Sequence, residues 1–235
     1  MKIISFDLKG KIGHYRRPDT TGAHLSYPII TRTVTHGLIA SILGLERLDG
    51  KAWIGIELHS PVKTRAQELS MLGKGWIGGG KESFNRPTSI ELVVSPSYRI
   101  YYAGDYLETL EEMLVNQKSF YHTYLGSAYC LTFPQFVASS ELEVLTPPYP
   151  EELNSLTVVP SHCIESLVID EGAKYGRVGG MHYEYLGERK FNGTVNIIYD
   201  YDGKQIRFKP KEHQPSGSHP YLFLRFGKEE VICLW

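Results

Sequence analysis

Two arginines and an aromatic ring stand together near the start of the chain, in the run His14-Tyr15-Arg16-Arg17. A guanidinium binds phosphate through paired hydrogen bonds and also stacks on flat rings. This combination suits a strand of nucleic acid whose bases are unpaired. The alternative is an exposed loop whose charges form surface ion pairs. Arg16 and Arg17 are therefore candidates to clamp a phosphate and to stack on a base.

A glycine-rich segment, LGKGWIGGGKESFNRP over residues 72–87, adds three cations and an indole. From Gly75 it follows the G-x-x-x-x-G-K pattern of a phosphate-binding loop, but Glu82 replaces the Ser or Thr that would hold magnesium. We interpret the segment as a hairpin whose indole offers a stacking face to an unpaired base. The alternative is a surface loop with the indole in the core. The candidate residues for these phosphate and base contacts are Lys74, Trp76, Lys81 and Arg86.

A further pair of candidates lies on a predicted helix. Apolar residues recur every three or four positions from Val34 to Leu45, and Thr31 or Thr33 can cap the start. Arg32 and His36 are four residues apart and therefore share a face. Arg32, near the helix N-terminus, could join the backbone amides there in holding a phosphate. The alternative for His36 is a hydrogen-bonded, half-buried imidazole.

Catalytic and metal-binding motifs are not found. The histidines form no HExxH pattern, and the three cysteines, at 130, 163 and 233, form no CxxC pair. We therefore expect no metal and no cofactor. Metal-free RNA cleavage needs a base, an acid and cations around the phosphate. Tyr15, His36 and a nearby lysine could supply them, so this alternative stays open although no spacing demands it.

The elements that must position these residues follow from hydrophobic periodicity. Residues 4–8 alternate as a half-buried strand, and further strands are expected at 52–60, 88–94, 98–103 and 128–145. A second helix should begin after Asp105, acting as its cap with Glu108. The order is β-α-β-β-α-β, the plan of ferredoxin-like folds and of RRM modules. The predicted class is α+β, with this domain over 1–145 and a hairpin at about 73–90.

The remainder, 146–235, is predicted to be a smaller strand-rich domain that begins after the prolines near 147–150. Asp202-Gly203 is predicted as a hairpin turn, and Asn192-Gly193 as another turn.

The charge is divided between the two ends of the chain. Residues 1–99 hold 14 Lys and Arg against 8 Asp and Glu, while residues 100–235 hold 11 against 18. A basic N-terminal part and an acidic C-terminal part indicate that the chain has two different partners. No apolar run approaches the ~20 residues of a membrane helix, and no signal peptide is recognisable. We expect a cytoplasmic protein without a membrane partner.

These residues resemble the Cas-five family, RAMP-superfamily subunits of type I CRISPR effector complexes. The resemblance covers about residues 1–145. It rests on the opening strand with its basic loop, on the glycine-rich hairpin and on two further segments. These two segments are YPIITRTVTHGLIASILGLE, which is the most specific, and HTYLGSAYCLTF. In the family an Arg commonly follows the glycine of the last segment, whereas Ser127 follows Gly126 here, so we assign no phosphate contact there.

The resemblance implies an RRM-like domain whose glycine-rich hairpin is a thumb. It implies a partner, the 5′ handle of the crRNA, and a position in Cascade beside the large subunit and the first backbone subunit. It also implies RNA contacts at the candidate residues, which are Arg16, Arg17, Arg32, His36, Lys74, Trp76, Lys81 and Arg86. Target DNA near the PAM would be reached only through the complex. The helix THGLIASILGLE is closer to the type I-B branch, in which a separate endonuclease cuts the precursor. The chain is therefore expected to bind the RNA for antiviral defence without catalysis; the alternative is a metal-independent endoribonuclease.

Overall fold

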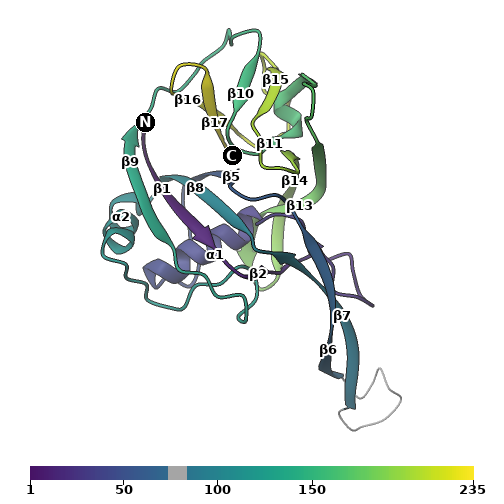
Figure 1. Cartoon of the computed structure of the whole chain (residues 1–235). Helices are drawn as coiled ribbons and strands as arrows, with labels where there is room; N and C mark the ends of the chain where they lie inside the picture. The colour runs from purple at the N-terminus through teal and green to yellow at the C-terminus, as the bar shows by residue number, and fades with distance from the viewer. Residues whose placement is uncertain (74–83) are drawn as a thin grey trace.

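The computed structural model describes residues 1–73 and 84–235 as a mixed α+β fold dominated by strands (Figure 1). Its main sheet has four antiparallel strands in the order β5-β8-β1-β9. The strands are β1 (Lys2–Lys9), β5 (Ala52–Leu58), β8 (Ser97–Gly104) and β9 (Gln135–Glu141). Together with the two helices they follow the predicted order, β1-α1-β5-β8-α2-β9. Residues 128–134, predicted as strand, belong to no strand.

Two helices contact each other and cover one face of this sheet (Figure 1). Helix α1 (Arg32–Leu43) begins after Thr31, whose hydroxyl accepts the Val34 N–H, and ends at Gly44 with φ 74°. Helix α2 (Leu107–Val115) buries its leucines as predicted. Neither described helix is long and apolar enough to cross a membrane.

The predicted cap of α2 is wrong. Tyr106 occupies the cap position with φ 64°, and its side chain makes no capping hydrogen bond. The Asp105 carboxylate instead accepts the Lys51 N–H at 3.0 Å. The Asp105 carboxylate therefore binds Lys51, which is distant in the sequence, instead of capping the first turn of α2.

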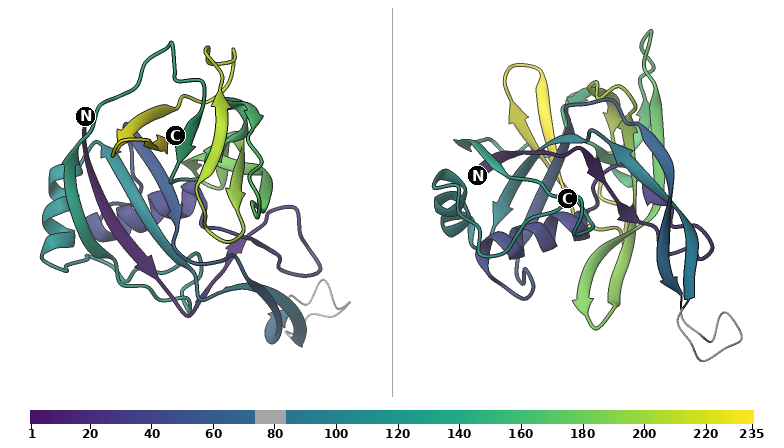
Figure 2. Two further views of the ribbon diagram at one scale, coloured as in Figure 1. Left: turned by 45° about the horizontal axis from the view of Figure 1, so that its top comes forward. Right: turned by 60° about the horizontal axis from the view of Figure 1, so that its bottom comes forward.

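A long hairpin leaves the body of the molecule as a two-stranded arm (Figure 2). Its strands are β6 (Thr64–Gly73) and β7 (Phe84–Val94), so the arm begins well before the predicted bound at 73. At the base, β2 (Ile12–Gly13) adds a third strand beside β7. The adjoining pair β3 (Tyr15–Arg16) and β4 (Ser26–Tyr27) forms its own small ladder.

The second half consists of two sheets and one short 3₁₀ helix, η1 (Ser161–Cys163). The five-stranded sheet, in spatial order, contains β12 (Ile164–Leu167), β15 (Ile206–Pro210), β10 (Leu153–Ser155), β17 (Glu230–Leu234) and β16 (Leu222–Phe226). The three-stranded sheet contains β11 (Val159–Pro160), β14 (Lys190–Asp200) and β13 (Tyr175–Gly187).

Both predicted turns in this half are corrected. Asp202-Gly203 does turn the chain, but the flanking strands β14 and β15 lie in different sheets and form no hairpin. Asn192-Gly193 lies inside β14, and the chain turns at Glu188-Arg189, where both residues have positive φ. Packing of Gly193 against the His219 ring explains the glycine there, because an added Cβ would lie 2.3 Å from that ring.

The two halves are joined through the outer edge of β5. Ile54 and Trp235 exchange main-chain hydrogen bonds of 3.2 and 3.0 Å, and Val158 N–H donates to the Ile56 carbonyl at 2.8 Å. Gly55 permits this approach, because an added Cβ would lie 2.9 Å from Leu234. One hydrophobic cluster therefore runs through both halves. The boundary at 145/146 stays a prediction.

Trp235 is fully buried at this junction. We expect Trp235→Ala to lower the free energy of unfolding by about 3–5 kcal/mol, because the cavity cannot be refilled without moving both halves. Leu72→Ala, on a side chain 75% exposed, should change it by less than ~0.5 kcal/mol. Urea unfolding of both variants checks this, and a loss below 1 kcal/mol for Trp235→Ala would contradict the shared core.

Candidate nucleic-acid interface

The base of the β6–β7 arm is where predicted RNA contacts meet. The loop between β3 and β4 is tied to β7 at His24, whose N–H donates to the Ser89 carbonyl at 2.8 Å and whose carbonyl accepts the Glu91 N–H at 3.0 Å. His14 is buried, and its Nδ1 lies 2.8 Å from the Glu91 carbonyl oxygen. These contacts bring the loop side chains beside those of β7.

Four cationic or titratable groups form what we call the basic cluster: His14, Arg16, His24 and Arg86. Burial lowers the pKa of His24, and the charges of Arg16 and Arg86 lower it further. Burial also lowers the pKa of His14, with Arg16 adding to the effect. Within residues 1–73 and 84–235, Arg16 and Arg86 form no ion pair. An anion placed among these groups therefore stabilises their positively charged forms.

A support for this cluster lies in the segment that contains Gly126. Leu125 is buried, and its carbonyl accepts the His14 N–H at 3.0 Å. Gly126 has φ 86°, and a Cβ there would lie 2.1 Å from the His14 carbonyl oxygen. The segment HTYLGSAYCLTF thus packs beneath the basic loop, which gives its glycine a physical reason.

Arg17 occupies a different environment. Its guanidinium pairs with Asp19 at 2.7 Å and lies 5.9 Å from the centre of the Tyr27 ring. The Asp19 carboxylate raises the pKa of Arg17, but both side chains are well exposed, 41% and 59%. An exposed ion pair contributes little. Arg17 can therefore exchange this partner for a phosphate.

Arg32 and His36 are held inside the protein. Arg32 is 6% exposed, donates from Nη2 to the Ala52 carbonyl at 2.9 Å, and contacts His36 through Nη1. Its guanidinium also lies 4.4 Å from the centre of the Tyr183 ring, on β13. Strand β13 therefore covers the face of α1 that carries Arg32, which the sequence analysis expected to be open to RNA. Arg32 presents no exposed cation in this arrangement.

Of the remaining predicted contacts, Lys74, Trp76 and Lys81 lie outside the described residues. Sequence reasoning did not assign His14 or His24 to the site. No local sequence pattern identifies His24, because it reaches the site through a bridge to Ile90, a residue far away in the sequence.

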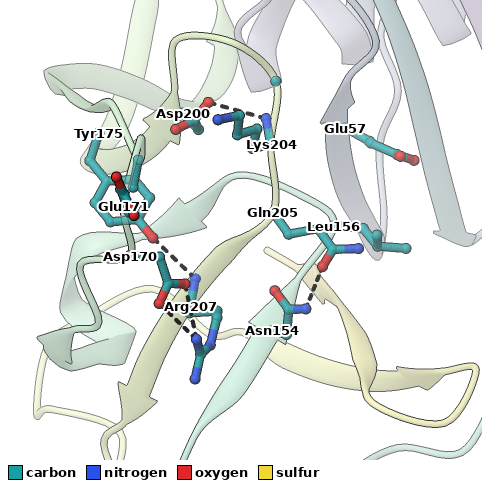
Figure 3. Close-up of a pocket in the computed structure, with 12 residues that line it drawn as sticks. Glu57, Asn154, Leu156, Asp170, Glu171, Tyr175, Asp200, Lys204, Gln205 and Arg207 are labelled. Atoms are coloured by element: carbon teal, nitrogen blue, oxygen red, sulfur yellow. Dashed lines mark hydrogen bonds and ion pairs between the residues drawn. The ribbon is translucent and has the colours of Figure 1, made fainter.

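A separate hollow lies in the second half, beside Asp200 and Arg207 (Figure 3). Asp200 is buried, and its carboxylate accepts the main-chain N–H groups of Lys174, Asp202 and Lys204. Arg207 bonds to Asp170 and Glu152. These charges satisfy one another, and the described residues contain no group arranged to hold a metal ion. This acidic hollow therefore does not suit an RNA strand.

Comparison with known proteins gives a likeness of fold. No family model matches the chain, and no curated protein matches it. A chain of a CRISPR RNA-guided surveillance complex superposes with a TM-score of 0.56 at 10% identity, covering 88% of this chain and 91% of that chain. This chain shares that fold.

Two further CRISPR proteins superpose less closely. A CRISPR protein from Archaeoglobus fulgidus has a TM-score of 0.49 at 11% identity, covering 99% of this chain and 98% of that one. A chain of a type III-B Cmr-beta complex bound to cognate target RNA has a TM-score of 0.48 at 9% identity, covering 88% and 86%. These three structures are of CRISPR proteins, and the likeness of fold rests on the surveillance-complex chain alone.

The Arg32–His36 contact predicts a dependence of stability on pH. Burial, and then the charge of Arg32, lower the pKa of His36 to about 3. The unfolded chain binds this proton below its ordinary pKa of about 6.5, whereas the folded chain does not. Stability should therefore fall as the pH drops from 6.5 toward 3, by up to ~1.4 kcal/mol per pH unit.

Urea unfolding at pH 6 and pH 4 measures this effect. We expect the wild type to lose about 2 kcal/mol more than His36→Gln over this interval, because glutamine does not titrate. Equal losses in the two proteins would show that His36 is protonated in the folded state.

Proposed function

We propose that this chain is a non-catalytic, RNA-binding subunit of a CRISPR effector complex, of the Cas-five type, which holds the 5′ handle of the crRNA. The observation that carries the proposal is the basic cluster, where His24 hydrogen-bonds to β7, the strand of Arg86, and thereby holds the loop that follows Arg16 against the arm. Single-stranded RNA offers closely spaced phosphates to such cations. The fold likeness to a surveillance-complex chain supports the same role.

The proposed layout is a ferredoxin-like domain over 1–145, with the β6–β7 arm as its thumb, followed by a strand-rich domain. The sheet order β5-β8-β1-β9 supports this assignment. RRM modules bind RNA on the open sheet face. Here Asp7 and Arg99 form an ion pair across two strands of the sheet, and Phe226 of the second half packs on Tyr101. We therefore direct the RNA to the arm and its base rather than to the sheet.

The second half, residues 146–235, holds 12 Asp and Glu against 10 Lys and Arg and is proposed to meet protein subunits. Several of its cations are already bound to carboxylates, among them Arg207 with Asp170 and Arg225 with Glu143. A surface whose cations are paired and whose net charge is negative repels RNA. The large and backbone subunits of the complex are the proposed partners.

The environments of the groups considered for catalysis favour binding without cleavage. Tyr15 is 1% exposed, which removes its hydroxyl from reach of a ribose. His36 is neutral and in contact with the Arg32 guanidinium. A general base must come within hydrogen-bonding distance of the proton that it removes. Neither group meets this requirement in the present arrangement.

The salt dependence of binding tests the RNA-binding role. Each cation that neutralises a phosphate of a single strand contributes about 0.7 to the slope of log K against log salt. Arg16→Ala with Arg86→Ala should weaken binding of a handle RNA and reduce the slope by about 1.4. Fluorescence anisotropy across a salt series measures both quantities.

The matched control is Lys209→Ala with Lys228→Ala, two exposed cations of the second half with the same total charge change. This control should leave the slope unchanged. If both double variants lower the slope equally, binding is a diffuse charge effect and the cluster is not the interface.

Incubation of the chain with its repeat RNA in EDTA tests the absence of catalysis. We expect the RNA to remain intact on a denaturing gel, because Tyr15 is buried and the His36 ring is in contact with the Arg32 guanidinium. His36→Ala and the exposed His213→Ala serve as a matched pair of histidine variants. Cleavage by the wild type that disappears only in His36→Ala would instead establish the metal-independent endoribonuclease.

A further inference from the structure

A hollow of about 330 Å³ lies where the base of the arm meets the strands β13 and β14. Three parts of the chain line it: the loop around Arg17 and Tyr27, the arm residue Glu91, and the second-half residues Arg177 and Tyr201. Its volume is at the lower end of the ~300–1,000 Å³ typical of small-molecule sites. It adjoins the basic cluster, because Glu91 is the residue whose main chain holds His14 and His24.

Two guanidiniums face this hollow from opposite halves of the chain. Arg177 is exposed and forms no ion pair within the part of the chain that the structure describes. Arg17 has only its exposed partner Asp19. Guanidiniums recognise phosphate oxygens through paired N–H donors. The two guanidiniums thus give the hollow the hydrogen-bond donors needed to bind one phosphate group.

An aromatic face completes one wall. Tyr201 is 45% exposed, while Tyr27 and Tyr199 are buried. The ring is held by an edge contact with Tyr199, at 5.0 Å between ring centres, and the Tyr201 carbonyl accepts the Val62 N–H at 2.8 Å. A fixed ring with an open face is a stacking platform for a base.

Glu91 adds a hydrogen-bond acceptor to the lining of the hollow. One of its carboxylate oxygens accepts the Ser26 N–H at 3.0 Å, which leaves acceptor capacity on the carboxylate. A carboxylate repels phosphate but accepts hydrogen bonds from an exocyclic amino group, as it does from cytosine. The lining therefore contains both donors for a phosphate and an acceptor for an amino group.

We infer that this hollow binds one unpaired nucleotide of the RNA, with its phosphate between Arg17 and Arg177, its base on Tyr201, and an exocyclic amino group on Glu91. The inference rests on the proposed RNA-binding function and extends it. It assigns RNA contacts to the second half, at two residues that sequence reasoning placed on the acidic side. It also gives the site a preference for amino-bearing bases over uracil.

The test uses the full chain and short single-stranded RNAs that carry 2-aminopurine at one position in turn. This base fluoresces and carries an exocyclic amino group. One position should show a change of fluorescence on binding that disappears in Tyr201→Ala and persists in Tyr201→Phe. Tyr201→Ala and Arg177→Ala should each weaken binding about fivefold or more. The control Lys228→Ala removes an exposed cation of the second half without affecting the hollow, and should change the affinity less than twofold.

The same titrations with oligo(A), oligo(C) and oligo(U) test the base preference, which should favour A and C over U and decrease in Glu91→Gln. The pocket is overturned if the wild type binds RNA and Arg16→Ala weakens it, while Arg177→Ala and Tyr201→Ala stay within twofold of the wild type. Failure of the wild type to bind any of these RNAs overturns the proposed function itself. The two failures are therefore distinguishable.

Discussion

Main-chain pairing along the outer edge of β5 is the constraint on which the arrangement of the whole chain depends. The exchange of hydrogen bonds between Ile54 and Trp235, together with that from Val158 to Ile56, leaves the four-stranded sheet without a free edge on that side. Edge pairing of this kind fixes register as well as position. It holds the second half so that β13 covers the start of α1, and β14 ends beside the arm. The hollow between Arg17 and Arg177 exists only because this register is kept.

The guanidiniums of the basic cluster have no carboxylate partner among the described residues. Burial lowers the pKa of His14 and of His24, and the charge of Arg16 lowers both further. Elsewhere, as at Arg99 with Asp7, a carboxylate stands opposite the guanidinium. The hydrogen bonds from His24 to β7 hold the loop in place beside these cations. A phosphate that enters the cluster supplies the missing negative charge.

Sequence reasoning succeeded where periodicity and burial agree. The strand from Ile4 to Leu8 and both helices follow directly from spacing, since each has one face that must be buried.

Prediction from the sequence failed where a contact with a residue distant in the sequence determines the structure. Arg32 has the spacing of an exposed helix residue, but β13 lies on that face and buries it. Asp105 has the type of a cap, but Lys51 takes its carboxylate. The signal for His24 is its pairing with Ile90, which no local pattern contains. Lys74, Trp76 and Lys81 lie outside the described residues, and their contacts with RNA remain predictions.

The way in which the arm is anchored has a mechanical consequence. Partner segments reach β7 only at its inner end, through β2 at Val93 and through His24 at Ile90, and beyond that point the described part of the arm has two strands. Six residues separate Ile90 from Phe84, which at the rise of a strand is about 20 Å. A rotation of roughly 10° at Ile90 therefore displaces the outer end of β7 by about 3.5 Å, close to the ~3.4 Å rise per nucleotide of one strand of a duplex.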